Sequence, residues 1–265
     1  MSWPDGRRAA STLSFDNLGE VADLQRGLWP EDEPLGHHFS VTRVLPRVLG
    51  LLKESGLRAT FFVEGRAAEL YPGTLVELAA AGHEVGLHGW CHEDWAGLGR
   101  AREAELLERG ARAMETLGLR PVGFRPPGGR LTGASLALLG EHGFAHCSPA
   151  GQDPAVERHV TVVPFQWPLV DAYHYLPRFR AMRERDLGSG EALPPARFHA
   201  TLDAGLADAV AGGRHLSVLF HPFLSEPDDR FDVLRHHLEV VRALVDQGVL
   251  WCAPYRDVAA VFGRL

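Results

Sequence analysis

The strongest constraint on the fold of this chain is the alternation of short apolar runs with stretches of helical periodicity. Runs such as ATFFV (residues 59–63) and LSVLF (216–220) alternate, along most of the chain, with segments whose apolar residues recur every three or four positions. Several helical segments stop at a glycine, as at Gly56, Gly82 and Gly118. Such alternation predicts an α/β fold in which crossover helices connect parallel strands. About seven strands fit a barrel or an open sheet, and periodicity does not choose between them.

The alternation lapses between residues 171 and 198. Aromatic residues, arginines, glycines and prolines occur there without clear periodicity. Irregular segments of this kind usually contact something, so we expect this one to form part of a pocket wall or a subunit contact, which leaves a homo-oligomer open. No internal repeat or linker interrupts the rest, and we expect one catalytic domain over residues 1–265.

Charge and composition exclude several classes of protein. The formal net charge of −7 argues against a protein that follows nucleic-acid phosphates. No stretch approaches the roughly 20 apolar residues that cross a bilayer, and the first residues lack the apolar core of a signal peptide. The three cysteines, Cys91, Cys147 and Cys252, form no CxxC pair and are typical of reduced thiols. We therefore expect a cytoplasmic protein without a nucleic-acid partner or a membrane span.

Reactive side chains stand at the ends of four predicted strands. Asp16 ends LSFD, His88 ends EVGLH, Arg125 ends VGFR and His221 ends SVLFH. Each residue alone has an ordinary structural explanation, such as a turn cap, a surface ion pair or a packed ring. The working residues of parallel α/β folds, however, project from the carboxyl ends of the strands. Four such residues at four strand ends predict one shared cluster.

The residue types of this cluster suit the hydrolysis of an amide. His88 and His92, four residues apart, are candidate ligands of a divalent ion, which would lower the pKa of a water molecule from ~16 toward ~7. Asp16 is the candidate general base, and Arg125 would orient it and keep it ionised. His221 would protonate the departing nitrogen.

Five motifs then occur in a recognisable order: SFDN (14–17), HGWCH (88–92), RPPGG (125–129), FQWPLVD (165–171) and LFH (219–221). With them the chain resembles the polysaccharide deacetylases of carbohydrate esterase family 4, which share the NodB homology domain. The resemblance implies a distorted (β/α) barrel with about seven parallel strands. It also implies the roles given above for Asp16, Arg125 and His221, metal binding by His88 and His92, and substrate contacts for Trp90 and Asp171. Asp171 could instead position other groups.

The chain departs from the family pattern at two places. The usual metal triad is an aspartate with two histidines, but Asn17 stands at the aspartate's place, and an amide oxygen is a weaker ligand than a carboxylate. Either Asn17 binds the ion weakly, or Asp16 or Glu20 replaces it, or the site works without a tightly held metal. We expect an occupied site that holds zinc, with cobalt, nickel or manganese as alternatives. Gly89 also replaces the usual Ser or Thr, which removes a hydroxyl.

The resemblance extends to a cytoplasmic branch of peptidoglycan-deacetylase-like and allantoinase-like proteins. It implies a metal-dependent hydrolase of carbon–nitrogen bonds other than peptide bonds, acting on a small-molecule or sugar substrate. The leading expectation is N-deacetylation of an acetylated amino sugar or a related small amide. Two alternatives stay open because of Asn17: an allantoinase-like hydrolase of cyclic amides or imides with little metal dependence, and a catalytically silent barrel that binds a ligand.

Overall fold

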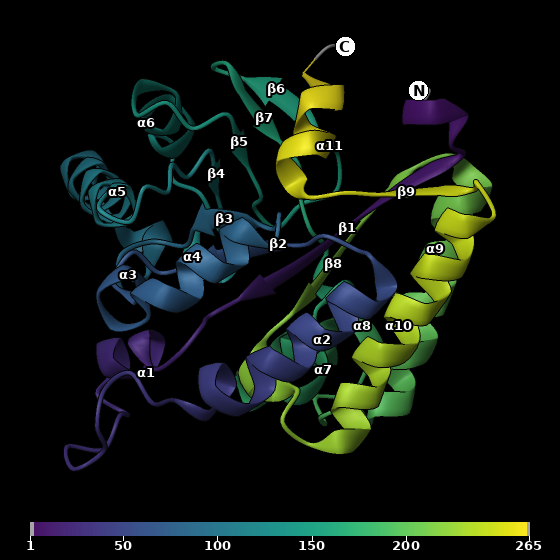
Figure 1. Cartoon of the computed structure of the whole chain (residues 1–265), viewed down its shortest axis with the longest axis horizontal. Helices are drawn as coiled ribbons and strands as arrows, with labels where there is room; N and C mark the ends of the chain where they lie inside the picture. Colours follow the sequence, from purple (N-terminus) through teal and green to yellow (C-terminus); the bar gives the residue numbers. More distant parts are fainter. Residues whose placement is uncertain (1–2, 264–265) are drawn as a thin grey trace.

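The computed structural model describes residues 3–263, which form a nine-stranded sheet with flanking helices (Figure 1). The strands follow the order β6-β7-β5-β4-β3-β2-β1-β8, and β9 pairs with β1. The paired strands are parallel except for β6 and β7. The strands are β1 (Ala9–Asp16), β2 (Thr60–Val63), β3 (Glu84–Leu87), β4 (Gly123–Phe124), β5 (His146–Cys147), β6 (Ala155–Glu157), β7 (Val160–Val162), β8 (His215–Phe220) and β9 (Leu250–Cys252). The predicted α/β fold is confirmed.

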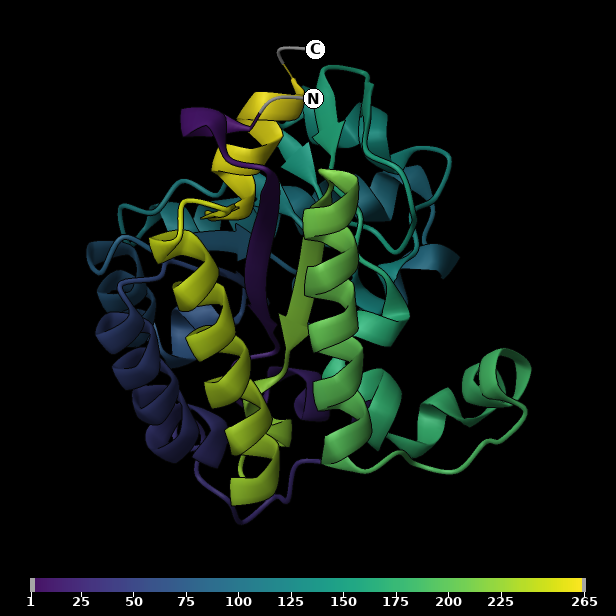
Figure 2. The same ribbon diagram turned by 90° about the vertical axis from the view of Figure 1, so that its right-hand side faces the viewer.

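Helices cover the outside of the sheet. They are α1 (Val21–Arg26), α2 (Leu45–Ser55), α3 (Ala67–Leu70), α4 (Pro72–Ala80), α5 (Arg100–Glu115), α6 (Ser135–Glu141), α7 (Asp171–Tyr175), α8 (Arg180–Leu187), α9 (Pro195–Gly212), α10 (Asp228–Asp246) and α11 (Tyr255–Phe262). Figure 2 shows α9 and α10 side by side along β1 and β8. As predicted, Gly56 ends α2 in the left-handed conformation, with a φ of 63°. None of the helices within residues 3–263 has the length and apolar character needed to span a bilayer.

The sheet curls around β1 and closes only in part. On one edge β1 pairs with β8, and on its other edge it pairs with β9 near its start and with β2 near its end. Beyond β7, two single parallel bridges, Ala150 to Phe165 and Val170 to Leu219, connect the two sides of the sheet. Single bridges in place of a full strand explain why the barrel is distorted, and this confirms the predicted shape.

One end of the barrel is filled by α11. Tyr255, Val258 and Phe262 on this helix pack in one apolar cluster with Phe62 and Val163 from the strand side. A cavity lies at the opposite end, where the parallel strands have their carboxyl termini. Ligand sites of α/β barrels lie at that end.

The sequence analysis did not predict β6. It forms a hairpin with β7, and the two residues between the strands, Arg158 and His159, both have positive φ, 52° and 67°. Hairpin turns with two positive φ values usually contain Asn-Gly or Asp-Gly. Because neither dipeptide occurs here, the sequence gives no turn signal.

Residues 171–198, called the arm below, contain more regular structure than expected. They form α7, a turn at Pro177–Phe179, α8 and the start of α9, and α8 projects from the body of the molecule (Figure 2). The buried guanidinium of Arg183 donates to the carbonyl oxygens of Tyr173, Leu176 and Gly190. One arginine therefore holds three separate turns of the arm together, a long-range role that periodicity cannot reveal.

Candidate active site

A cavity of about 540 Å³ opens at the carboxyl ends of the strands. The strand-end residues Asp16, His88, Arg125 and His221 all line it, together with His92. The structure thus brings together the residues that the sequence analysis assigned to one cluster, because neighbouring parallel strands end at the same edge of the sheet.

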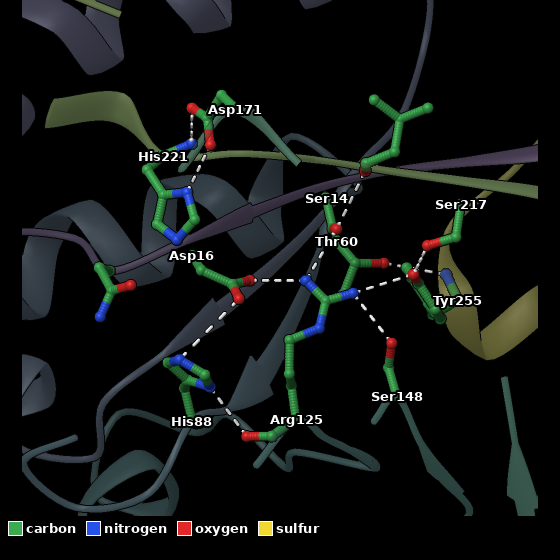
Figure 3. Close-up of polar contacts among 12 residues, drawn as sticks. Ser14, Asp16, Thr60, His88, Arg125, Ser148, Asp171, Ser217, His221 and Tyr255 are labelled. Atoms are coloured by element: carbon green, nitrogen blue, oxygen red, sulfur yellow. Dashed lines mark hydrogen bonds and ion pairs between the residues drawn. The ribbon is translucent and has the colours of Figure 1, made fainter. Parts of the chain in front are cut away.

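Asp16 lies against the guanidinium of Arg125 (Figure 3). Its Oδ1 accepts a hydrogen bond of 2.7 Å from Nη1 of Arg125, and its Oδ2 lies 3.9 Å from Nε2 of His88. Burial raises the pKa of Asp16 above its usual 3.8, and the positive charge of Arg125 opposes that rise only in part. Asp16 is therefore a more basic carboxylate than an exposed aspartate.

The Arg125 guanidinium is held on several sides. Nη1 donates to Ser14, and Nη2 donates to Ser148 and to the hydroxyl of Tyr255, each at 2.9 Å. The guanidinium carbon lies 4.3 Å from the ring centroid of Phe62. A guanidinium fixed by hydrogen bonds and by an aromatic face has little freedom, so it sets the position of the Asp16 carboxylate.

His221 is oriented by Asp171. Nδ1 of His221 lies 2.6 Å from Oδ1 of Asp171, and the backbone N–H of His221 donates to Oδ2 at 2.7 Å (Figure 3). A carboxylate can only accept here, so Nδ1 carries the proton and Nε2 is the atom available to the cavity. Asp171 is buried and absent from the cavity lining that the described residues form. Its contacts are those of a positioning residue rather than a substrate contact.

His88 and His92 present neutral imidazoles. Nδ1 of His88 donates to the carbonyl oxygen of Arg125 at 2.8 Å, which leaves Nε2 as an acceptor. Burial lowers the pKa of His88 to about 3, and burial together with the neighbouring His88 lowers the pKa of His92 as well. The two ring centroids are 5.1 Å apart. Neutral imidazoles are the form that binds metal ions, and Nε2 of His88 is free to do so, whereas Nδ1 of His92 accepts a hydrogen bond of 3.3 Å from Arg26.

Sequence reasoning missed a third member of this group. Glu64 follows β2 directly, is fully buried, and offers a carboxylate oxygen within 4.8 Å of the donor nitrogens of His88 and His92. Its Oε1 accepts a hydrogen bond of 2.5 Å from Nδ2 of Asn17, whereas its Oε2 has no hydrogen-bond partner among the described residues. Burial raises the pKa of Glu64 to about 8. The orphaned buried oxygen and the two neutral imidazoles fit a divalent cation such as zinc.

Two residues expected as the third ligand, Asn17 and Glu20, have other hydrogen-bond partners in the structure. Asn17 lines the cavity, with a φ of 59°, but its amide nitrogen is turned toward Glu64. Glu20 is engaged elsewhere, because its carboxylate accepts from the N–H of Gly36 and from the hydroxyl of Tyr71. Its carboxylate is therefore directed away from His88 and His92 in this structure, and metal binding by Glu20 stays a prediction.

The loop between His88 and His92 is stabilised by Glu93. Its carboxylate accepts hydrogen bonds from the backbone N–H groups of Trp90 at 3.0 Å and Cys91 at 2.9 Å. A Cβ atom at Gly89 would lie 2.8 Å from Oε2 of Glu93, and the φ of Gly89 is +72°. A side chain at Gly89 would therefore crowd the Glu93 carboxylate that holds this loop.

The substrate contact of Trp90 stays a prediction. The Trp90 ring belongs to the hydrophobic core, lies 3.9 Å from the guanidinium carbon of Arg109, and is absent from the cavity lining within residues 3–263. The expected pocket wall from the arm is confirmed, since Arg178, Phe179 and Met182 line the cavity. Whether the arm also forms a subunit contact stays a prediction.

Comparisons with known proteins find similarity to polysaccharide deacetylases. Residues 31–147 match the family model for polysaccharide deacetylase. A peptidoglycan deacetylase of Helicobacter pylori is 32% identical over 134 residues, or 50% of this chain and 42% of that protein. A peptidoglycan deacetylase-like protein of Gibberella zeae is 34% identical over 111 residues, or 40% of this chain and 33% of that protein. The matched parts thus cover less than half the length of these relatives.

Two solved structures cover nearly the whole chain. A protein from Mycobacterium smegmatis assigned to the polysaccharide deacetylases superposes with a TM-score of 0.82 and 30% identity, over 98% of this chain and 92% of that one. The PuuE allantoinase superposes with a TM-score of 0.77 and 21% identity, over 97% of this chain and 91% of that one. The second likeness concerns the fold alone.

Proposed function

The chain belongs to the polysaccharide deacetylase family of hydrolases, which act on carbon–nitrogen bonds other than peptide bonds, and we propose that it deacetylates an acetylated amino sugar or a related small amide. One observation carries the proposal. A buried carboxylate, Asp16, and an oriented imidazole, His221, line one cavity beside the donor group of Glu64, His88 and His92.

These residues divide the chemistry of amide hydrolysis among them. A divalent cation held by the donor group would polarise the amide carbonyl and lower the pKa of the attacking water. Asp16, kept in place by Arg125, accepts a proton from the water as its oxygen adds to the carbonyl carbon. His221 acts in its doubly protonated form: Nε2 donates its proton to the departing nitrogen, while Nδ1 keeps its hydrogen bond to the Asp171 carboxylate, which stabilises the imidazolium. The carbon–nitrogen bond breaks, and the products are a carboxylate and an amine.

The cavity supports a small substrate. Its volume of about 540 Å³ lies in the range of sites for single small molecules. Phe165, Trp167 and Phe179 give it apolar walls, and the arm supplies one side. A single sugar or a small amide fits such a space better than an extended polymer.

Hydrolysis of a cyclic amide or imide is the second candidate. Ring opening needs the same general base and the same general acid, and the volume of the cavity suits a compact ring. Asn17 also favours it, because a site without the family's aspartate is the one expected to depend little on metal. A silent barrel is the third reading, and it requires binding without turnover.

The test measures two products in parallel. The purified protein, supplied with zinc, cobalt, nickel or manganese, is assayed for acetate release from N-acetylated amino sugars and for ring opening of allantoin, hydantoin and succinimide. Metal-stimulated acetate release that disappears in Asp16→Asn supports the deacetylase. Chelator-insensitive ring opening supports the cyclic-amide hydrolase. Absence of turnover on every substrate contradicts both enzymatic proposals.

A further inference from the structure

Glu64 and His88 stand side by side at the ends of neighbouring strands. β2 and β3 pair in register from Thr60 to Val63, and the N–H of His88 donates to the carbonyl oxygen of Val63 at 2.8 Å. On the other edge of β2, Asp16 at the end of β1 is paired with Phe62. Asn17 and Glu64 therefore leave adjacent strands at the same edge of the sheet.

This arrangement lets a carboxylate reach the same point from a different strand. Neighbouring strands lie about 4.8 Å apart, and glutamate is longer than aspartate by one methylene group. The carboxylate of Glu64 reaches the histidine pair from β2, and Asn17 at the end of β1 contacts it from the other side. The carboxylate that is missing after β1, where Asn17 stands, is thus supplied after β2 by Glu64.

The carboxylate of Glu64 lacks a cationic partner. Glu64 is fully buried, and no arginine or lysine within the described residues forms an ion pair with it. Its Oε2 accepts no hydrogen bond in that part of the chain. Burying a carboxylate without a partner is costly. A bound cation would supply the missing charge.

The orientation of Asn17 follows from its contact with Glu64. Nδ2 of Asn17 donates to Oε1 of Glu64, so the amide oxygen is turned away from the carboxyl group. An amide N–H does not bind a cation. Asn17 therefore acts on the carboxylate, whereas a metal ligand at this position would have to present its oxygen.

We infer that Glu64, together with His88 and His92, is the anionic metal ligand of this protein, in place of the aspartate that Asn17 replaces. Asn17 is a positioning residue that holds Glu64 through Oε1 and leaves Oε2 for the ion. The inference rests on the proposed function in one respect, that the site binds a divalent cation. It differs from the earlier expectation, in which Asn17 itself was the ligand.

Zinc affinity, measured by competition with a chromophoric chelator, tests the inference without an activity assay. Loss of the carboxylate in Glu64→Gln is expected to weaken zinc binding at least ~100-fold, and Asn17→Ala about tenfold, since removing a residue that orients a ligand costs 10–100-fold. The double variant Asn17→Asp/Glu64→Gln returns a carboxylate to the β1 end and should recover most of the affinity. Glu20→Gln, a buried carboxylate outside the donor group, is the control and should bind zinc as the unmodified protein does.

A cobalt spectrum gives a second readout, because its visible bands report the ligand set. The bands should change in Glu64→Gln and keep their shape in Glu20→Gln. Circular dichroism checks folding. If Glu64→Gln does not fold, Glu64→Asp, which keeps the charge on a shorter side chain, should still bind zinc about tenfold more weakly. Unchanged zinc affinity in a folded Glu64 variant would overturn the inference.

The failure of this inference is distinguishable from failure of the proposed function. If zinc binds in a Glu64-dependent way but no amide is hydrolysed, Glu64 remains the ligand and the deacetylase proposal falls. If the protein hydrolyses amides with no bound metal and with Glu64→Gln unaffected, the hydrolase stands and the ligand assignment falls.

Discussion

Two groups of two histidines and one carboxylate occur in the described part of the chain, and they differ in almost everything but composition. The cavity cluster is Glu64, His88 and His92, and the surface cluster is His199, Asp203 and His236. In both, the candidate donor atoms lie within 4.8 Å of one another. The surface cluster joins α9 to α10, and its two rings have centroids 3.9 Å apart.

Burial and surroundings separate the two clusters. The surface side chains are 39–43% exposed, and Asp203 lies 3.5 Å from Nε2 of His199 and 3.3 Å from Nε2 of His236. The cavity cluster holds neutral rings and lies beside a general base and a general acid. The comparison teaches that donor atoms at the right spacing do not by themselves make a catalytic site. The cavity cluster lies at the strand ends, where a general base and a general acid are close by.

The largest expected effect concerns the general base. Asp16→Asn keeps the hydrogen bond from Arg125 but removes the proton acceptor, so kcat/KM should fall about 10³-fold. Zinc content should stay unchanged, because Asp16 is outside the donor group. The matched variant Asp203→Asn in the surface cluster should leave steady-state kinetics intact. Equal losses in the two variants would erase the functional distinction between the clusters.

The general acid comes next. His221→Ala should lower kcat by about 10²-fold, because the leaving nitrogen then departs without a positioned proton donor. Asp171→Asn should cause a smaller loss, since it weakens the hydrogen bonds that orient the His221 ring. His236→Ala is the control on the surface. A substrate with a good leaving group should recover much of the rate in His221→Ala only, and no such recovery would argue against proton donation.

The pH dependence of kcat/KM tests the environment of Asp16. Asp16 must be ionised to act as a base, and burial raises its pKa above 3.8. As the pH falls through that raised pKa, Asp16 becomes protonated, so kcat/KM should decline at a higher pH than for an ordinary aspartate. Profiles of the unmodified protein and of Asp203→Asn should coincide. A decline centred at or below pH 3.8 would show that burial has no such influence.

How far the sequence predicts this site depends on the rule applied to it. The strand-end rule found Asp16, His88, Arg125 and His221, because each follows an apolar run directly. Glu64 obeys the same rule after ATFFV, but the family pattern directed attention to β1, where the aspartate is missing. Contacts between distant residues, such as that of Asn17 with Glu64, leave no periodic signal. They follow from the order of the strands, which the sequence alone did not determine.

The fold shows the same division between local patterns, which the sequence reveals, and contacts between distant residues, which it does not. Helices such as α2 and α5 carry both periodicity and a terminal glycine, so they were predicted close to their observed bounds. The hairpin of β6 and β7 turns through Arg158 and His159, residues that do not normally signal a turn. The two short helices of the arm depend on Arg183, whose partners lie seven to ten residues away.

A smaller effect is expected at the loop that holds His88 and His92. Gly89→Ser places a Cβ 2.8 Å from Oε2 of Glu93 at a φ of +72°, so it should lower the free energy of unfolding by about 2–3 kcal/mol. Gly118→Ser has the same φ of +72° with no atom within 4 Å, so strain alone should cost about 1 kcal/mol. Chemical denaturation measures both. Equal losses would mean that Glu93 does not restrict Gly89.

The smallest effect is expected in the surface cluster, and it decides how the two clusters compare as metal sites. The unmodified protein should bind one equivalent of zinc tightly, and any second equivalent should bind at least ~100-fold more weakly. Nδ1 of His88 is held by the carbonyl oxygen of Arg125, whereas the half-exposed surface rings have no such orienting partner among the described residues. His199→Ala and His236→Ala should remove only the weak equivalent and leave kcat/KM unchanged. Isothermal titration of each variant separates the two events. Two equivalents of equal affinity would show that burial adds little to metal binding in this protein, and the distinction drawn from the neutral rings of His88 and His92 would then be lost.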